Sequence, residues 1–393
     1  RQMSDEEIAE LIDRRMDACM EEQPEEFPQT LGERLKLHRE LFDSFRRLDI
    51  LQELVDDPRV TEIMVNGPDQ VFVETGGKIG RWEKSFESRE QLEDLIQQIV
   101  SSVNRIVNTS MPLADARLSD GSRVHVVLEP IALNGPILTI RKFPEPMTME
   151  RLLDYGSISP EAADLLKTLV AARYNIFVSG GTGAGKTTFL NALSEFIPPG
   201  ERVITIEDAA ELQLNHIENL VRMETREANA EGAGAIGIGE LIRAALRMRP
   251  DRLIIGEVRG KEALDLLQSL NTGHDGGFSS GHANSVKDML SRLETMVLMA
   301  ADLPLAAIRS QIASAVDIMV HVSRMRDKTR KVTAIEEVDR FENGEIILNP
   351  LFTFREAEKA GDGFGNTGKV EGSLEQIGTL KHREKLRLAG YRV

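Results

Sequence analysis

The feature that most limits how this chain can fold is a glycine-rich segment, residues 180–188. Four residues separate its outer glycines, and Lys and Thr follow the second one. The apolar residues 176–178 precede it like a buried strand, and residues 189–193 follow it with the composition of a helix. The sequence therefore predicts a strand, a phosphate-binding loop and a helix in succession, rather than an incidental glycine-rich turn.

This loop predicts the binding of a nucleoside triphosphate together with Mg²⁺. Glycines let successive N–H groups point at phosphate oxygens, and the following helix adds its positive end. Lys186 is expected on the β- and γ-phosphates, and the hydroxyl of Thr187 on Mg²⁺. The predicted binding residues are Gly180, Gly181, Thr182, Gly183, Ala184, Gly185, Lys186, Thr187 and Thr188.

Composition narrows the class of protein. A chain of 393 residues with 41% hydrophobic and 28% charged residues suits a globular protein of two domains with appendages. The net charge of −16 disfavours a broad nucleic-acid-binding surface. Cys19 is the only cysteine, which excludes an internal disulfide and suits a reducing cytoplasm. No apolar run is long enough for a membrane helix, so we expect membrane association through partners and no direct insertion.

The order of strand-like and helix-like segments predicts an α/β fold. From residue 159 onward the two kinds alternate, which is typical of a mostly parallel sheet covered on both faces. Strands are predicted at 175–179, 202–206, 252–256, 278–282 and 317–322, and helices at 186–196, 240–249, 260–270, 285–300 and 304–315. The predicted divisions are a helical N-terminal extension (1–54), a smaller α+β domain (55–142), a hinge linker (143–158), the nucleotide-binding domain (159–330) and a β-rich C-terminal extension (331–393).

Two acidic positions follow predicted strands and are candidates for catalysis. Glu257 ends the apolar strand 252–256, at the sheet edge where the phosphate loop is expected. Gly256 stands where proteins with a phosphate-binding loop usually have the Walker B aspartate. We therefore assign Glu257 to polarising the attacking water rather than to direct metal ligation. Glu207 and Asp208 close the strand 202–206, and adjacent like charges there call for a cation. Two readings stay open: a solvated Glu257, and an Asp208 that only caps the following segment.

Two histidines lie in a segment rich in Gly and Ser, residues 273–285. His282 is expected to donate a hydrogen bond to the γ-phosphate. For His274, a core position and a functional one remain equally open. The candidate metal-binding residues are Thr187, Glu207, Asp208 and Glu257.

Several motifs together resemble the ATPases of the type II/type IV secretion and type IV pilus superfamily. Most similar are the CpaF/TadA-like ATPases of tight-adherence (Flp) pili, over residues 50–393. The motifs are residues 60–67, 115–123, 138–143, 180–188, 206–208, 247–260 and 281–285. A four-cysteine zinc insertion of the pilus-extension branch is missing here, which favours the tight-adherence or conjugative branches.

The resemblance implies a RecA-like P-loop NTPase core that uses ATP and Mg²⁺. It also implies a homo-oligomer, a hexameric ring on the cytoplasmic face of the inner membrane, bound to pilus or secretion platform proteins. Arginines from a neighbouring domain or subunit would neutralise the transferring phosphoryl group, although each could equally form a surface salt bridge. The catalytic set implied is Glu257, Lys186, Glu207, His282, Arg117, Arg123 and Arg141.

From these features we expect an ATP hydrolase whose turnover powers assembly of tight-adherence pilus subunits. The first alternative is a type IV secretion ATPase for conjugation or effector transfer, whose core chemistry is the same. A RecA-like nucleic-acid translocase is a further alternative that the acidic charge disfavours, and no stable nucleic-acid partner is expected. Glu257 and His282 argue against a nucleotide switch without hydrolysis.

Overall fold

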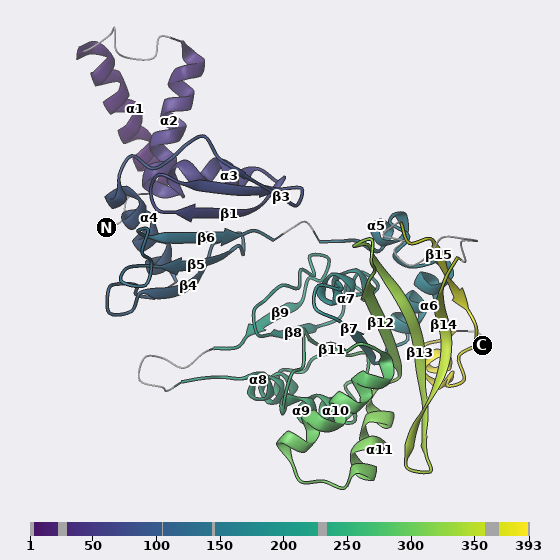
Figure 1. Ribbon diagram of the computed structural model, residues 1–393. Helices are drawn as coiled ribbons and strands as arrows, with labels where there is room; N and C mark the ends of the chain where they lie inside the picture. Colours follow the sequence, from purple (N-terminus) through teal and green to yellow (C-terminus); the bar gives the residue numbers. More distant parts are fainter. Residues whose placement is uncertain are drawn as a thin grey trace. The chain divides into compact units, whose positions relative to one another are not determined.

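The computed structural model describes residues 4–22, 30–103, 105–143, 146–226, 234–357 and 369–391. The chain divides into two compact units, Arg1–Glu145 and Pro146–Val393, and each is considered by itself below (Figure 1). The division falls inside the segment 143–158 that we predict as a linker, of which residues 144 and 145 lie outside the described part. That segment also holds a short helix, α5 (Met149–Asp154).

The first unit begins with helices whose starts are set by polar caps. The helices are α1 (Asp5–Glu22), α2 (Leu31–Arg46), η1 (Asp49–Leu51) and α3 (Gln52–Asp56). The hydroxyl of Ser4 accepts a hydrogen bond from the N–H of Glu7 at 3.2 Å. Thr30 and Glu33 form a reciprocal capping box at the start of α2. These caps satisfy N–H groups that a helix leaves without an internal partner.

A six-stranded antiparallel sheet forms the rest of the first unit. Its strands are β1 (Val60–Asn66), β2 (Val71–Thr75), β3 (Lys78–Arg81), β4 (Leu113–Arg117), β5 (Arg123–Val127) and β6 (Ile137–Arg141), in the order β3-β2-β1-β6-β5-β4. Alternate residues such as Val124 and Ile140 are buried with α4 (Arg89–Ser102) in one core. The intervening residues, Arg123 and Arg141 among them, therefore occupy the opposite face.

The second unit contains a nine-stranded sheet with a parallel centre. Its strands are β7 (Ile176–Gly180), β8 (Val203–Glu207), β9 (Leu220–Glu224), β10 (Arg252–Ile255), β11 (Phe278–His282), β12 (Ile318–Arg324), β13 (Arg330–Glu342), β14 (Glu345–Glu356) and β15 (Gly372–Gln376). The order is β15-β14-β13-β12-β7-β11-β10-β8-β9, and pairing is parallel from β12 through β9. The phosphate-loop strand β7 thus lies between β12 and β11.

Helices cover both faces of this sheet, as the alternating sequence pattern predicts. They are α6 (Pro160–Ala171), α7 (Lys186–Ser194), α8 (Ile238–Ala245), η2 (Leu246–Met248), α9 (Glu262–Leu270), α10 (Val286–Ala300), α11 (Leu305–Ala315) and α12 (Glu384–Leu388). Residues of α6 and α7 pack in one core with Ile176 and Val178, and residues of α8 to α11 pack in another with Phe177. The mixed α/β class follows from this arrangement.

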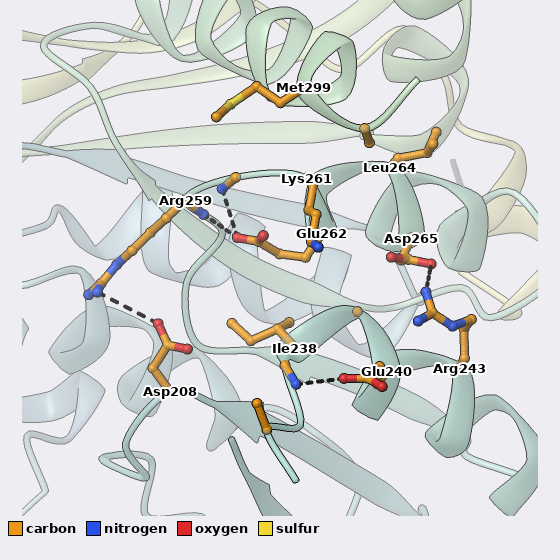
Figure 2. Close-up of a pocket in the computed structure, with 15 residues that line it drawn as sticks. Asp208, Ile238, Glu240, Arg243, Arg259, Lys261, Glu262, Leu264, Asp265 and Met299 are labelled. Atoms are coloured by element: carbon orange, nitrogen blue, oxygen red, sulfur yellow. Dashed lines mark hydrogen bonds and ion pairs between the residues drawn. The ribbon is translucent and has the colours of Figure 1, made fainter. Parts of the chain in front are cut away.

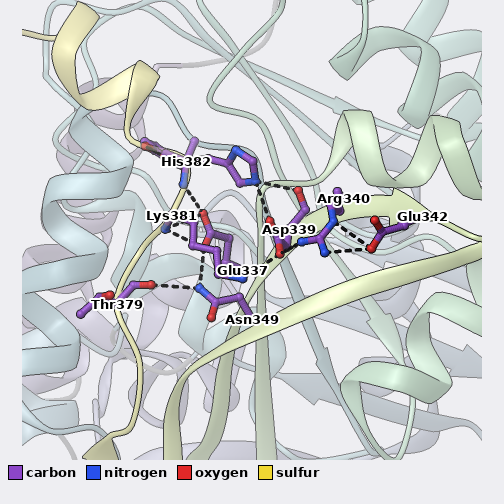
Figure 3. Close-up of polar contacts among 9 residues, drawn as sticks. Glu337, Asp339, Arg340, Glu342, Asn349, Thr379, Lys381 and His382 are labelled. Atoms are coloured by element: carbon purple, nitrogen blue, oxygen red, sulfur yellow. Dashed lines mark hydrogen bonds and ion pairs between the residues drawn. The ribbon is translucent and has the colours of Figure 1, made fainter.

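The C-terminal segment extends the same sheet. β13 and β14 form a hairpin whose turn residues Asn343 and Gly344 both have positive φ, as the Asn-Gly pair predicts. Beyond β15, the chain is held against β13 by the carboxylate of Glu337, which is 1% exposed (Figure 3). Glu337 accepts hydrogen bonds from the N–H groups of Lys381 and His382 at 2.9 and 2.8 Å. The last described helix is therefore fixed to the sheet by a buried acid.

No single helix in the described ranges is both long enough and apolar enough to cross a membrane. Within these ranges, α10 and α11 together have the required length and apolar composition, but they are bent at 119° to each other.

Candidate active site

The phosphate loop lies at the carboxyl end of a fully buried strand. All five residues of β7 are buried, and α7 begins at Lys186 directly after the loop. Gly183 and Gly185 have φ of 71° and 95°, a left-handed conformation that side chains with a Cβ rarely adopt. A Cβ at Gly180 would clash with the carbonyl of Val322 on β12. The glycines at these positions are therefore required by the path of the loop.

Three of the predicted site residues meet beside this loop. Nζ of Lys186 lies 3.1 Å from Nδ1 of His282, at the end of the neighbouring strand β11. Nε2 of His282 lies 2.9 Å from Oε1 of Glu257, which follows β10. The register explains the meeting, since β7, β11 and β10 are parallel neighbours whose carboxyl ends share one edge.

Burial and charge keep the imidazole of His282 neutral. Burial lowers the pKa of His282, the ammonium of Lys186 lowers it further, and the carboxylate of Glu257 opposes both. Burial also lowers the pKa of Lys186, again against the effect of Glu257. A neutral His282 can accept a hydrogen bond from Lys186 at Nδ1 and carry its proton on Nε2.

One oxygen of Glu257 is available for chemistry. Oε2 accepts a hydrogen bond from Arg259 at 3.0 Å. Oε1 is buried and, among the described residues, has no aligned hydrogen-bond donor, although His282 is close. A buried carboxylate oxygen without a donor is costly unless a water or cation completes it. This geometry fits a group that receives a proton from water.

Arg259 joins this cluster to Asp208, an arrangement that the sequence did not predict. Its Nη1 lies 3.6 Å from Oδ2 of Asp208, and its other nitrogen binds Glu257. Both Arg259 and Asp208 also line a pocket of about 1020 Å³ that opens next to α8 and α9 (Figure 2). One indication of this contact is present in the sequence, namely that Arg259 follows Glu257 by two residues.

Glu207 occupies a different environment from Glu257. Its side chain is 3% exposed, and Oε1 accepts hydrogen bonds from the N–H groups of Glu211 and Leu212 at 2.8 and 3.1 Å. Burial raises the pKa of Glu207 to about 7, against the effect of those two hydrogen bonds. A Cβ at Gly256 would lie 2.8 Å from Cγ of Glu207. Glu207 thus fills the space that an aspartate at position 256 would need.

The residues present fit Mg²⁺ carried in with a nucleotide. The described part of the chain has no group of three or more His, Cys, Asp or Glu side chains that could hold a metal ion. Thr187 lies in the first turn of α7, where a hydroxyl can bind a cation that phosphates also bind. The donor set therefore suits a metal held largely by phosphate oxygens, and the metal roles of Thr187, Glu207, Asp208 and Glu257 stay predictions.

The other candidates fall in two places. His274 precedes β11 and so lies at the opposite end of that strand from His282. Arg117, Arg123 and Arg141 belong to the first unit, where they stand directly opposite one another on β4, β5 and β6. Like charges directly opposite on adjacent strands repel, although Arg117 and Arg123 also have interactions within the chain, and Arg123 lies over the ring of Phe143. This row on one sheet face is consistent with binding of a phosphoryl group.

Comparisons with known proteins agree on one family. A family model described as type II/IV secretion system protein matches residues 46–351. A putative conjugal transfer protein of Mycobacterium tuberculosis is 39% identical over 293 residues, 73% of this chain and 83% of its own. The type IV secretion system protein PtlH of Bordetella pertussis is 35% identical over 67% of this chain and 86% of its own. The fold is similar to that of the Legionella pneumophila ATPase DotB, with a TM-score of 0.55 and 19% identity, over 76% and 81% of the two chains.

Proposed function

This chain belongs to the type II/IV secretion system protein family, and on that premise we propose that it is an ATP-hydrolysing motor of a type IV secretion machine. The observation that carries the proposal is the contact of Lys186, His282 and Glu257 at the end of three parallel strands, next to the phosphate loop. Phosphate binding and an acid for water activation in one place are what hydrolysis requires.

Each residue has a definite task in the proposed reaction. The N–H groups of the phosphate loop and Lys186 hold the β- and γ-phosphates. Glu257 orients the attacking water through its free Oε1 and takes up its proton. His282, kept neutral by burial and by Lys186, donates a hydrogen bond from Nε2 to the γ-phosphate once that phosphate attracts Lys186.

Mg²⁺ bound with the nucleotide would neutralise charge on the β- and γ-phosphates. Thr187, in the first turn of α7, is the residue proposed to hold it, and Glu257 and Asp208 are proposed to bind its waters. Glu207 is proposed to shape this edge of the site, because its carboxylate is occupied by backbone N–H groups.

The wider assembly is proposed from the family. The second unit is a RecA-like P-loop core, supported by its central parallel strands and by the loop after β7. Arg117, Arg123 and Arg141 are proposed to neutralise charge on the transferring phosphoryl group. We place the motor as a hexameric ring at the cytoplasmic face of the inner membrane, bound to platform proteins.

The type of machine is the finer question. The names of the relatives, a conjugal transfer protein and a type IV secretion system protein, support the type IV alternative better than our expectation of tight-adherence pilus assembly. The two predict different defects in cells that carry only the Lys186→Ala protein. If the protein drives a type IV secretion machine, these cells should lose DNA or effector transfer and keep normal tight-adherence pili. Loss of tight-adherence pili with normal transfer would overturn the proposal.

A further inference from the structure

The hairpin that joins β12 to β13 lies level with the phosphate loop. β12 runs parallel to β7 with Val322 beside Gly180, so residues beyond Val322 extend past the start of the loop. β13 then returns antiparallel, with Arg330 opposite Arg324. Residue 330 is thus brought beside Gly183 of the phosphate loop, which is 147 residues away in the sequence.

Arg330 contacts the loop directly. Its Nε donates a hydrogen bond to the carbonyl of Gly183 at 3.0 Å. Its Cδ lies 3.3 Å from where a Cβ at Gly185 would stand, and that position is also 4.0 Å from Cβ of Thr188. The stem of Arg330 therefore packs on the loop between Gly183 and the first turn of α7, while its two terminal nitrogens have no hydrogen-bond partner among the described residues.

The turn that carries Arg330 is held in place by one carboxylate. Oδ1 of Asp327 accepts hydrogen bonds from the N–H and the hydroxyl of Thr329 at 3.0 and 2.6 Å. Its Oδ2 accepts another from the N–H of Val370 at 2.7 Å. The arginine is therefore presented from a turn that is fixed to its own strand end and to the C-terminal segment.

The charge of this hairpin is opposite to that of the whole chain. Residues 324–331 contain five Lys or Arg and one Asp, whereas the chain has a net charge of −16. Arg326 is neutralised by Glu356, at 2.8 Å between Nη1 and Oε2, and Nζ of Lys331 donates to the carbonyl of Gly156. A local excess of positive charge at the phosphate loop suits a polyphosphate ligand.

The strand order tells which part of the ligand Arg330 faces. β7 has β11 and β10 on one side, with His282 and Glu257, and β12 and β13 on the other. Lys186 points toward His282, on the side where hydrolysis is proposed. Arg330 lies on the opposite side of β7. It is therefore expected to face the part of the nucleotide that is remote from the γ-phosphate.

From these contacts we propose that Arg330 is a nucleotide-binding residue of the same chain, which holds the α- and β-phosphates of ATP and ADP against the phosphate loop. The proposal rests on the proposed function. It adds a residue from the hairpin that joins β12 to β13 to a site otherwise built from the phosphate loop and the ends of parallel strands.

The test is isothermal titration of the full chain with ADP and with a non-hydrolysable ATP analogue, in Mg²⁺. Arg330→Met keeps an unbranched stem against Gly185 and removes the charge. We expect the dissociation constants of both nucleotides to rise about tenfold and by the same factor, because both carry the α- and β-phosphates. In turnover assays the loss is expected in KM rather than in kcat.

A matched control and a salt series separate binding from simple support of the loop. Arg326→Met, on the same hairpin but paired with Glu356, is expected to leave both dissociation constants unchanged. If Arg330 contacts phosphate, Arg330→Met weakens the dependence of ADP affinity on salt concentration. A residue that only supports the loop would leave that dependence as in the wild type, which would overturn the proposal.

The remaining outcomes are equally decisive. Unchanged ADP affinity in Arg330→Met, with wild-type binding intact and Lys186→Ala impaired, would overturn this inference alone. A loss confined to the ATP analogue would place Arg330 at the γ-phosphate and contradict the position proposed here. Failure of the wild-type chain to bind either nucleotide would instead contradict the proposed function.

Discussion

At the scale of single residues, the site is a line of charged groups with one open position. Lys186, His282, Glu257 and Arg259 follow one another at contact distances of 3.1, 2.9 and 3.0 Å. Oε1 of Glu257 lies closest to Nε2 of His282 but has no aligned hydrogen-bond donor among the described residues. Water activation is proposed at that oxygen. The hydrogen bond from Arg259 to Oε2 holds the carboxylate of Glu257 in its orientation.

Glu207 provides a prediction about pH. Its pKa is raised by burial to about 7 from an ordinary value of 4.5, so the folded state holds the proton more tightly than the unfolded state. The protonated Glu207 therefore stabilises the folded state fully below about pH 4.5. This contribution to the free energy of unfolding, about 3 kcal/mol, is lost as pH rises through about 7. Glu207→Gln should lack this loss when unfolding by urea is measured between pH 5 and 8.

The control for that measurement is Glu218→Gln, an exposed glutamate of the same segment. The free energy of unfolding of Glu218→Gln should depend on pH in the same way as that of the wild type. Parallel curves for Glu207→Gln and the wild type would show that Glu207 does not titrate in this range.

Sequence reasoning found the residues of this line that sit at strand ends. Lys186, Glu257 and His282 were predictable because parallel strands end at one edge of a sheet. Arg330 was not, since only the β12–β13 register brings it to Gly183. The role of Glu207 in filling the space next to Gly256 was also missed, because a sequence gives no side-chain packing.

At the scale of elements, the C-terminal segment depends on one buried carboxylate. Glu337 on β13 accepts hydrogen bonds from Asn349 at 2.7 Å and from two backbone N–H groups of the segment after β15. Asp339 adds contacts from its main-chain and side-chain oxygens to His382 at 2.6 and 3.1 Å (Figure 3). These contacts join the last described helix, α12, to the sheet.

Removing that carboxylate should loosen the segment. We expect Glu337→Ala to lower the free energy of unfolding of the second unit by about 2–4 kcal/mol, because three donors lose their buried acceptor. Amide hydrogen exchange should become faster in residues 379–388. Glu342→Ala removes an exposed pair with Arg340 on the same strand and should change stability by less than about 1 kcal/mol. Equal effects of the two variants would contradict this account.

Most elements of the second unit follow from the sequence to within about two residues. The predicted strand 278–282 is β11, and the predicted helix 285–300 is α10, which begins one residue later. β9 was missed, because Leu220–Glu224 is a half-buried edge strand without a continuous apolar run. Residues 331–393 are predicted as a β-rich C-terminal extension, and β13 in this segment pairs with β12 in the same sheet.

At the scale of the whole molecule, the chain is built of two compact units. The first presents a row of three arginines, and the second contains the phosphate loop and the carboxylate of Glu257. Composition and motifs predict the two-part organisation and the family, and the family model covers residues 46–351.

The arginine row gives a prediction for the intact protein. Arg123 is half-buried and lies over the ring of Phe143, so thermal unfolding of Arg123→Ala is measured first to show that the fold is kept. We expect kcat to fall by at least tenfold, with little change in nucleotide affinity, because the charge is needed when the phosphoryl group is transferred. Arg59→Ala, which removes an exposed arginine paired with Asp57, is the control. Wild-type kcat in Arg123→Ala would exclude a role for this residue in catalysis.

The central claim is that a triphosphate held by the loop after β7 is hydrolysed with the help of Glu257. The most direct measurement pairs equilibrium binding of ATP with the rate of phosphate release, for the wild type and Glu257→Gln. The account predicts that the variant binds ATP as tightly as the wild type and loses at least a hundredfold in turnover. Turnover by Glu257→Gln at the wild-type rate would contradict it.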